Sequence, residues 1–118
     1  MRREWVFWNQ DTIDGEFDDL PARDASKLAG LMHLYRDAGF GNPYPAQVDD
    51  YGDGIYRLRH VKSAYSGRLL FFAVFRGHGV ERLVVLTVYK KESQVTPKRV
   101  LERAKSRMAE YQKRGEER

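Results

Sequence analysis

Three apolar runs with short polar connections place the strongest constraint on how this chain can fold. They are IYRLRHV (55–61), RLLFFAVF (68–75) and RLVVLTVY (82–89). Each run is rich in β-branched and aromatic residues, and each connection is short enough for a hairpin, which predicts three consecutive antiparallel strands. The middle run is apolar at both alternating positions, so we expect both of its faces to be covered and the strand to be central.

The first run differs from the other two because its charged and apolar residues alternate. Arg57 and Arg59 share one face of the expected strand, whereas Tyr56, Leu58 and His60 share the other. Unpaired guanidinium groups are costly to bury, so two of them on one face predict an exposed or functional surface. His60 lies on the apolar side, which favours a packed histidine over a catalytic base.

Helical periodicity marks two further segments. Pro21 suits the first turn of a helix that Gly39 ends, and Thr96 followed by Pro97 suits the cap and first turn of a second helix. The apolar stripes of the two helices are Ala25, Leu28, Leu31, Met32 and Tyr35 in the first, and Val100, Leu101, Ala104, Met108 and Tyr111 in the second.

The remaining segments show weaker patterns. Residues 4–8 (EWVFW) form a short aromatic strand candidate. The acidic stretch 9–19 predicts an irregular segment with a turn at Asp14 and Gly15, and the Gly-, Pro- and Asp-rich stretch 39–54 predicts a connecting loop.

Length and composition favour one compact domain spanning residues 1–118. The chain is 42% hydrophobic, and no apolar run approaches the roughly 20 residues of a membrane span. The charged start MRREW lacks the apolar core of a signal peptide, so we expect a cytoplasmic protein without a membrane partner. With no cysteine, scattered histidines and no calcium-loop pattern, we expect neither a metal site nor a cofactor.

The net charge of +4 conceals an asymmetry between the two halves of the chain. Residues 1–54 hold 5 Lys and Arg against 11 Asp and Glu, and residues 55–118 hold 16 against 6. The balances are therefore −6 and +10. A polyanion, an acidic protein or a phosphate partner for the second half would explain this, and so would a solvated basic face balanced by the acidic half.

The cations of the second half are interleaved with tyrosines. Aromatic rings can stack on bases while cations neutralise phosphates, so this mixture is typical of single-stranded RNA binding, although ordinary surface charge would give the same pattern. The residues concerned are Arg57, Arg59, Lys62, Arg68, Lys90, Lys91 and Arg99, with Tyr65 and Tyr89. Arg99, Arg103 and Arg107 also recur every four residues along one edge of the last helix.

The order of these motifs resembles the RelE/HigB-like toxins of bacterial type II toxin–antitoxin systems, in particular their phage-derived branch. That branch shows a Trp-Glu-Leu-Arg strand, an Arg opening the next strand, a hydrophobic strand ending in Lys-Lys, a Thr-Pro, and a helix with Ala and Arg three apart. The matching elements are Tyr56-Arg57-Leu58-Arg59, Arg68, Lys90-Lys91, Thr96-Pro97, and Ala104 with Arg107.

The resemblance implies an α+β fold, with a twisted antiparallel sheet of about four strands flanked by N-terminal and C-terminal helices. It implies a ribosome-associated mRNA endonuclease that works without a metal and is neutralised by an antitoxin, expected to carry a helix-turn-helix. Its partners would be the antitoxin, mRNA and the ribosome. Carried over residue by residue, the catalytic candidates are Arg68, Lys90, Lys91 and Arg59, and the RNA-binding candidates are Arg57, Lys62, Tyr65, Tyr89 and Arg99.

The sequence departs from the family pattern in two places. Tyr56 and Arg57 replace the usual Trp-Glu, which removes a carboxylate that could orient a neighbouring cation. The segment before the first long helix is short, so we expect any preceding helix to be lost or reduced.

Two other functions fit the same sequence. One is a toxin of the same fold without nuclease activity, similar to the ParE group, that binds a protein such as gyrase. The other is a phage-encoded module that binds nucleic acid without cutting it.

Overall fold

The computed structural model describes residues 2–38, 43–75, 79–93 and 95–116, which form five strands and three helices. In chain order these are β1 (Arg2–Phe7), α1 (Gln10–Asp18), α2 (Ala22–Ala38), β2 (Ala46–Asp50), β3 (Tyr56–His60), β4 (Gly67–Phe75), β5 (Val80–Lys90) and α3 (Lys98–Glu116). The α+β class and the flanking helices are confirmed.

All five strands belong to one sheet with the order β1-β5-β4-β3-β2. The predicted meander of β3, β4 and β5 is present, and β4 is central between its two neighbours. Two features differ from the prediction of about four antiparallel strands. β1 runs parallel to β5, and β2 pairs with β3 inside the segment expected to be a loop.

The first helix was not expected, because the stretch 9–19 is polar and contains Gly15. It is helical because the Asn9 side chain caps it by accepting a hydrogen bond from the backbone N–H of Thr12 (3.0 Å). Ile13 is its one fully buried residue and anchors it to the core. We expected any helix before α2 to be lost or reduced. It is not lost, because a nine-residue helix is present.

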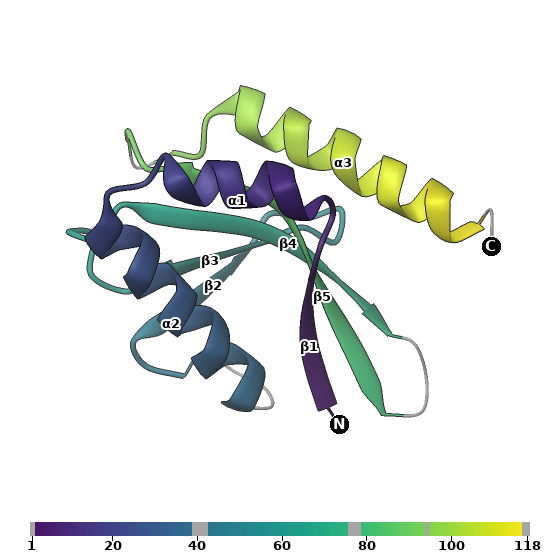
Figure 1. The fold of residues 1–118 in the computed structure, drawn as a ribbon, viewed down its shortest axis with the longest axis horizontal. Coiled ribbons are helices and arrows are strands. Elements are labelled where there is room, and N and C mark those ends of the chain that lie inside the picture. The colour runs from purple at the N-terminus through teal and green to yellow at the C-terminus, as the bar shows by residue number, and fades with distance from the viewer. Residues whose placement is uncertain (1, 39–42, 76–78, 94, 117–118) are drawn as a thin grey trace.

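The helices cover opposite faces of the sheet. α1 and α2 pack on the face that carries Leu58, Leu69 and Val85, and α3 packs on the face that carries Leu70 and Leu86. In Figure 1, α3 runs along the top of the sheet, while the hairpin of β4 and β5 extends away from it.

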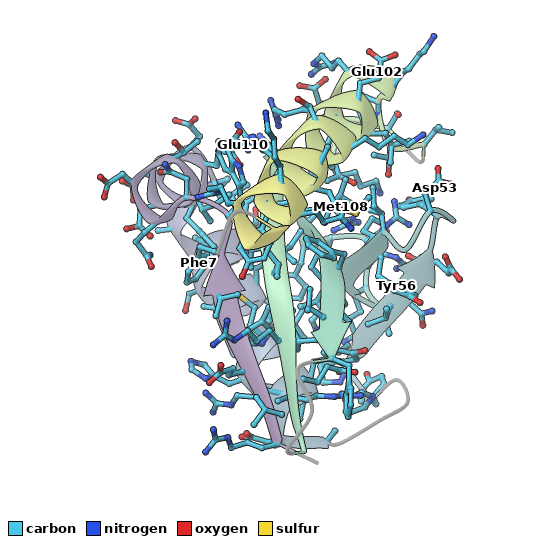
Figure 2. The ribbon with its side chains drawn as sticks, turned by 90° about the vertical axis from the view of Figure 1, so that its right-hand side faces the viewer. Phe7, Asp53, Tyr56, Glu102, Met108 and Glu110 are labelled. Carbon is cyan, nitrogen blue, oxygen red and sulfur yellow. The ribbon has the colours of Figure 1, made fainter. Side chains whose placement is uncertain are left out.

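The apolar stripe of α3 faces the strands as predicted. Val100 and Ala104 are buried, and Met108 packs beside them. Figure 2 shows Met108 on the side of α3 that faces the sheet, with Glu102 and Glu110 on its solvent side.

Side chains occupy the edge of β5 beyond the point where β1 ends. Glu16 of α1 accepts hydrogen bonds from the backbone N–H of Val88 (2.8 Å) and the hydroxyl of Thr87 (2.9 Å). Arg107 of α3 donates to Glu16 (2.7 Å) and to the carbonyl of Leu86 (3.0 Å). This junction, Glu16 with Arg107, ties α1, β5 and α3 together.

Candidate functional site

An arginine cluster lies on the α3 face of the sheet, in the row formed by the ends of β3, β4 and β5. The register places Arg59 beside Arg68 and Arg68 beside Tyr89. Arg57 lies two residues before Arg59 on the same face of β3. Four residues predicted from the sequence are thereby brought together on one face.

Asp49 of β2 holds two of these arginines. Its Oδ2 accepts hydrogen bonds from Arg57 Nε (3.1 Å) and a terminal nitrogen of Arg57 (2.8 Å), and from Arg59 Nε (3.1 Å). Burial acts to raise the pKa of Asp49, but the hydrogen bonds and positive charges of the two arginines hold it below its usual range. The carboxylate missing from the Trp-Glu position is therefore supplied by the neighbouring strand.

Arg68 is buried, with 3% of its surface exposed, and is bound to the main chain. It donates to the carbonyls of Tyr65 (2.6 Å) and Gly67 (3.0 Å). Burial lowers the pKa of Arg68, and the charges of Arg57 and Arg59 lower it further. Three guanidinium groups beside the single carboxylate of Asp49 leave a net charge of +2, which suits an anion such as phosphate.

Three hydroxyl groups meet beside the arginine cluster. The buried hydroxyl of Thr96 lies 2.7 Å from the Tyr51 hydroxyl and 3.0 Å from the Tyr89 hydroxyl, and it accepts from Arg57 (3.2 Å). Burial raises the pKa of Tyr89, although Thr96 and Arg57 oppose this. Tyr51 is the exposed end of the chain of hydroxyls, with 37% of its surface accessible, and Arg57 lies over its ring (5.2 Å).

The two lysines at the end of β5 do not form one site. Lys90 registers with Gly67 on the α2 face and is exposed, whereas Tyr89 before it lies on the α3 face. Lys91 continues the strand pairing through a bond from its backbone N–H to the carbonyl of Ser66 (2.7 Å) and is half-buried. Since successive residues of an extended chain point to opposite faces, the pair diverges.

The other predicted residues lie around the cluster rather than in it. Lys62 is exposed in the connection between β3 and β4. Tyr65 packs on the ring of His60 (4.5 Å), which is buried as predicted. Arg99 is exposed in the first turn of α3 and lies 3.7 Å from Glu92.

Acids of the first half of the chain neutralise many cations of the second. Besides Asp49, ion pairs across the halves join Glu16 with Arg107 (2.7 Å), Glu4 with Arg82 (3.1 Å) and Asp53 with Lys105 (3.4 Å). Arg103 donates to Thr87 (2.9 Å), so it and Arg107 are structural. The basic edge of α3 is thus largely paired within the molecule.

One protein-family comparison decides the family. The model described as "Phage derived protein Gp49-like (DUF891)" matches residues 15–109, which is more than half of the chain. The chain belongs to this family. The Gp49-like family is a family of RelE/HigB-like toxins, so the resemblance seen in the sequence is confirmed, and with it a toxin of the toxin–antitoxin type. Membership implies an antitoxin partner.

Other comparisons add little to this. A solved structure described as a YoeB/ParE toxin from Agrobacterium tumefaciens is similar, at 18% identity and a TM-score of 0.45, over 77% of this chain and 99% of that one. No curated protein matches the Gp49-like chain.

None of the helices in the described ranges has the length and apolar character needed to cross a membrane. Nor, within those ranges, do three or more His, Asp or Glu side chains gather as a metal-binding set.

Sequence reasoning missed Asp49, Tyr51 and the role of Thr96 in the site. The first two fall in a stretch interpreted as a loop, and Thr96 was interpreted only as a helix cap. One signal was present: Gly52, Asp53 and Gly54 all adopt positive φ (80°, 56° and 81°) in the turn that joins β2 to β3. A Gly-Asp-Gly turn ahead of a strand is a hairpin pattern, and it would have placed Asp49 opposite Arg57.

Proposed function

We propose that this Gp49-like protein is a metal-independent endoribonuclease that cuts mRNA on the ribosome and so inhibits translation. The observation that carries the proposal is the cluster of Arg57, Arg59 and Arg68 around one carboxylate. A partly buried anion site with fixed guanidinium groups meets the main requirement of RNA cleavage, which is to stabilise negative charge on phosphorus.

The proposed reaction is an attack of the RNA 2′-hydroxyl on the adjacent phosphate. The 2′-oxygen forms a bond to phosphorus and the bond from phosphorus to the 5′-oxygen breaks, which leaves a 2′,3′-cyclic phosphate and a 5′-hydroxyl. Arg57 and Arg59 bind the equatorial oxygens, whose negative charge grows in the transition state. Arg68 is buried beside Arg59 and adds its positive field.

Two protons move in this reaction: one leaves the 2′-hydroxyl and one reaches the 5′-oxygen. Tyr51 is the more exposed of the two tyrosines that contact Thr96, since Tyr89 is buried. We assign Tyr51 to one of these transfers. Lys91, half-buried after β5, remains the proposed second group, and Lys90 serves as a point charge for the RNA backbone.

The surrounding cations would guide the RNA and the ribosome. Lys62 and Arg99 are exposed, and a phosphate would displace Glu92 from its exposed ion pair with Arg99 (3.7 Å). The antitoxin, which we expect to be a helix-turn-helix protein, would block this surface in the resting cell.

Inducible expression of variants tests the proposal. Wild type should arrest growth and produce new mRNA 5′ ends within translated regions, while Arg59→Ala, Arg68→Ala and Lys91→Ala should each reduce both effects. Lys113→Ala is the control, because Lys113 is exposed in the last turn of α3, at the far end of that helix from Thr96 and Arg99. All variants are first checked for folding by circular dichroism.

Two contrary results select the other functions. Growth arrest with intact mRNA and altered DNA supercoiling would identify a gyrase-directed toxin. Salt-sensitive RNA binding by a protein that neither arrests growth nor cuts RNA would identify a binding module.

A further inference from the structure

A cavity of about 450 Å³ lies on the α2 side of the molecule, separate from the arginine cluster. One wall is a single face of α2 that includes Arg23, Lys27 and Gly30, and the other contains Pro45 and Tyr65. None of the functions discussed above uses this cavity.

Two cations are fixed at the mouth of the cavity by the ring of Tyr65. The Arg23 guanidinium lies 4.8 Å from the ring centroid and donates to Asp24 (3.1 Å) and to the carbonyl of Ala64 (2.8 Å). Despite these three partners, 65% of the Arg23 side chain is exposed. A planar cation is thus held rigid with much of its surface open.

Lys27 adds a second positive charge that is not neutralised by an ion pair. Its ammonium group lies 4.9 Å from the Tyr65 ring centroid, and no carboxylate in the described part of the chain forms an ion pair with it. Asp24, the nearest acid in the sequence, is engaged by Arg23 and by the Ser66 hydroxyl (2.7 Å). The mouth of the cavity is therefore electropositive.

Apart from Ser26, the rest of the cavity lining is apolar. Leu34 and Pro45 line it, and Gly30 leaves a gap in the helix wall, since a Cβ added there would meet nothing within 4 Å. Tyr44, next to Pro45, is 73% exposed. Apolar walls beside a rigid guanidinium suit a flat ring with a phosphate attached.

One residue, Tyr65, contacts both the cavity and the arginine cluster. The Tyr65 carbonyl accepts the hydrogen bond from Arg68 (2.6 Å), so the same residue forms the cavity wall and fixes an arginine of the cluster. The connection between β3 and β4 carries both contacts around the end of the sheet.

We propose that this cavity binds an unpaired base, with its phosphate, from the same RNA strand that is cut at the arginine cluster. The base lies beside Gly30, between Leu34 and Pro45, and its phosphate lies at Lys27 and Arg23. This inference rests on the proposed function and extends it, because a second base site would give the nuclease a preference for sequence at a fixed distance from the cut.

The test measures binding of a 2′-O-methyl oligoribonucleotide of about eight nucleotides, which cannot be cut, by fluorescence anisotropy. Gly30→Glu places a carboxylate in the cavity and should weaken binding about tenfold. Ala109→Glu, which adds the same charge to an exposed position of α3 on the other face of the sheet, should bind like wild type. A set of oligonucleotides, each lacking the base at a different position, is also measured. Loss of the base at one position should weaken binding to wild type and leave binding to Gly30→Glu unchanged.

Cleavage of unmodified mRNA is measured in parallel in a translating extract, which supplies ribosomes, and it separates the two proposals. If wild type cuts RNA and Gly30→Glu binds the oligonucleotide as tightly as wild type does, the cavity inference is wrong and the nuclease stands. If wild type neither binds nor cuts RNA, the proposed function fails and the cavity inference fails with it. If Gly30→Glu loses binding to the antitoxin alone, the cavity is a protein-docking site and the inference is overturned.

Discussion

Replacing Asp49 with asparagine should weaken the fold and strengthen RNA binding at the same time. Asp49 makes three contacts of 2.8 to 3.1 Å with Arg57 and Arg59, and its side chain is 27% exposed. Charged hydrogen bonds contribute about 1.5–3 kcal/mol when buried, whereas exposed ion pairs contribute about 0–1 kcal/mol. For this partly exposed group we expect Asp49→Asn to lower the free energy of unfolding by about 1–2 kcal/mol.

The same substitution releases two guanidinium groups for phosphate. Each additional phosphate contact steepens the dependence of log binding constant on log salt by about 0.7 for a single strand. Because Arg57 and Arg59 face one scissile phosphate, removing the competing charge of Asp49 should steepen this slope by up to about 0.7. Urea unfolding and anisotropy titrations over a range of salt concentrations measure the two effects separately.

The stability effect should also depend on pH with a defined sign. The folded-state pKa of Asp49 is lowered, so its contribution is fully present above the unfolded-state value of about 4 and is lost as the pH falls through the folded value. The difference between wild type and Asp49→Asn should thus be full at neutral pH and vanish in acid.

Asp50→Asn is the matched control for this prediction. Asp50 is exposed, carries the same charge, and an asparagine there keeps an oxygen to accept from the backbone N–H of Gly52 (2.7 Å). If Asp49→Asn and Asp50→Asn have the same stability, or if the salt slope of Asp49→Asn matches wild type, Asp49 does not restrain the arginines as argued.

Three further predictions concern stability and are measured by urea unfolding. Glu16→Ala should lower the free energy of unfolding by about 3 kcal/mol, because it leaves Arg107 partly buried without its partner. Glu16→Gln keeps an acceptor for the sheet edge and should cost about half as much. Equal costs for the two variants would contradict a role for the charge. Thr96→Val should cost about 1–2 kcal/mol, since the buried Tyr89 hydroxyl loses its partner; a neutral effect would mean that water replaces it. Leu58→Ala, fully buried, should cost about 2–5 kcal/mol, and a cost under about 1 kcal/mol would contradict its place in the core.

Elements with a buried periodic face could be predicted from the sequence, and those held by specific polar contacts could not. The strands β3, β4 and β5 and the helices α2 and α3 each bury a regular stripe, and periodicity reports burial. α1 depends on the cap at Asn9, and β2 is a polar strand whose pairing includes the contact from Asp49 to Arg57. Contacts of this kind join residues that no local pattern relates.

The candidate site could likewise be predicted only in part from the sequence. Strand alternation placed Arg57 and Arg59 on one face, and the strand-opening Arg68 joined them through the sheet register. The same alternation separates Lys90 from Lys91, which adjacency in the sequence had linked. Charge asymmetry between the halves indicated a polyanion partner, but part of it is satisfied inside the molecule.

The junction of Glu16 with Arg107 also protects the protein from self-association through the edge of its sheet. An unpaired strand edge invites another chain to add to the sheet, and natural proteins block such edges with charge. Glu16 takes the N–H of Val88 and Arg107 takes the carbonyl of Leu86, the two groups that an incoming strand would bind. An ion pair thus stands in for the missing length of β1, and a substitution there would open the sheet to aggregation as well as loosen the fold.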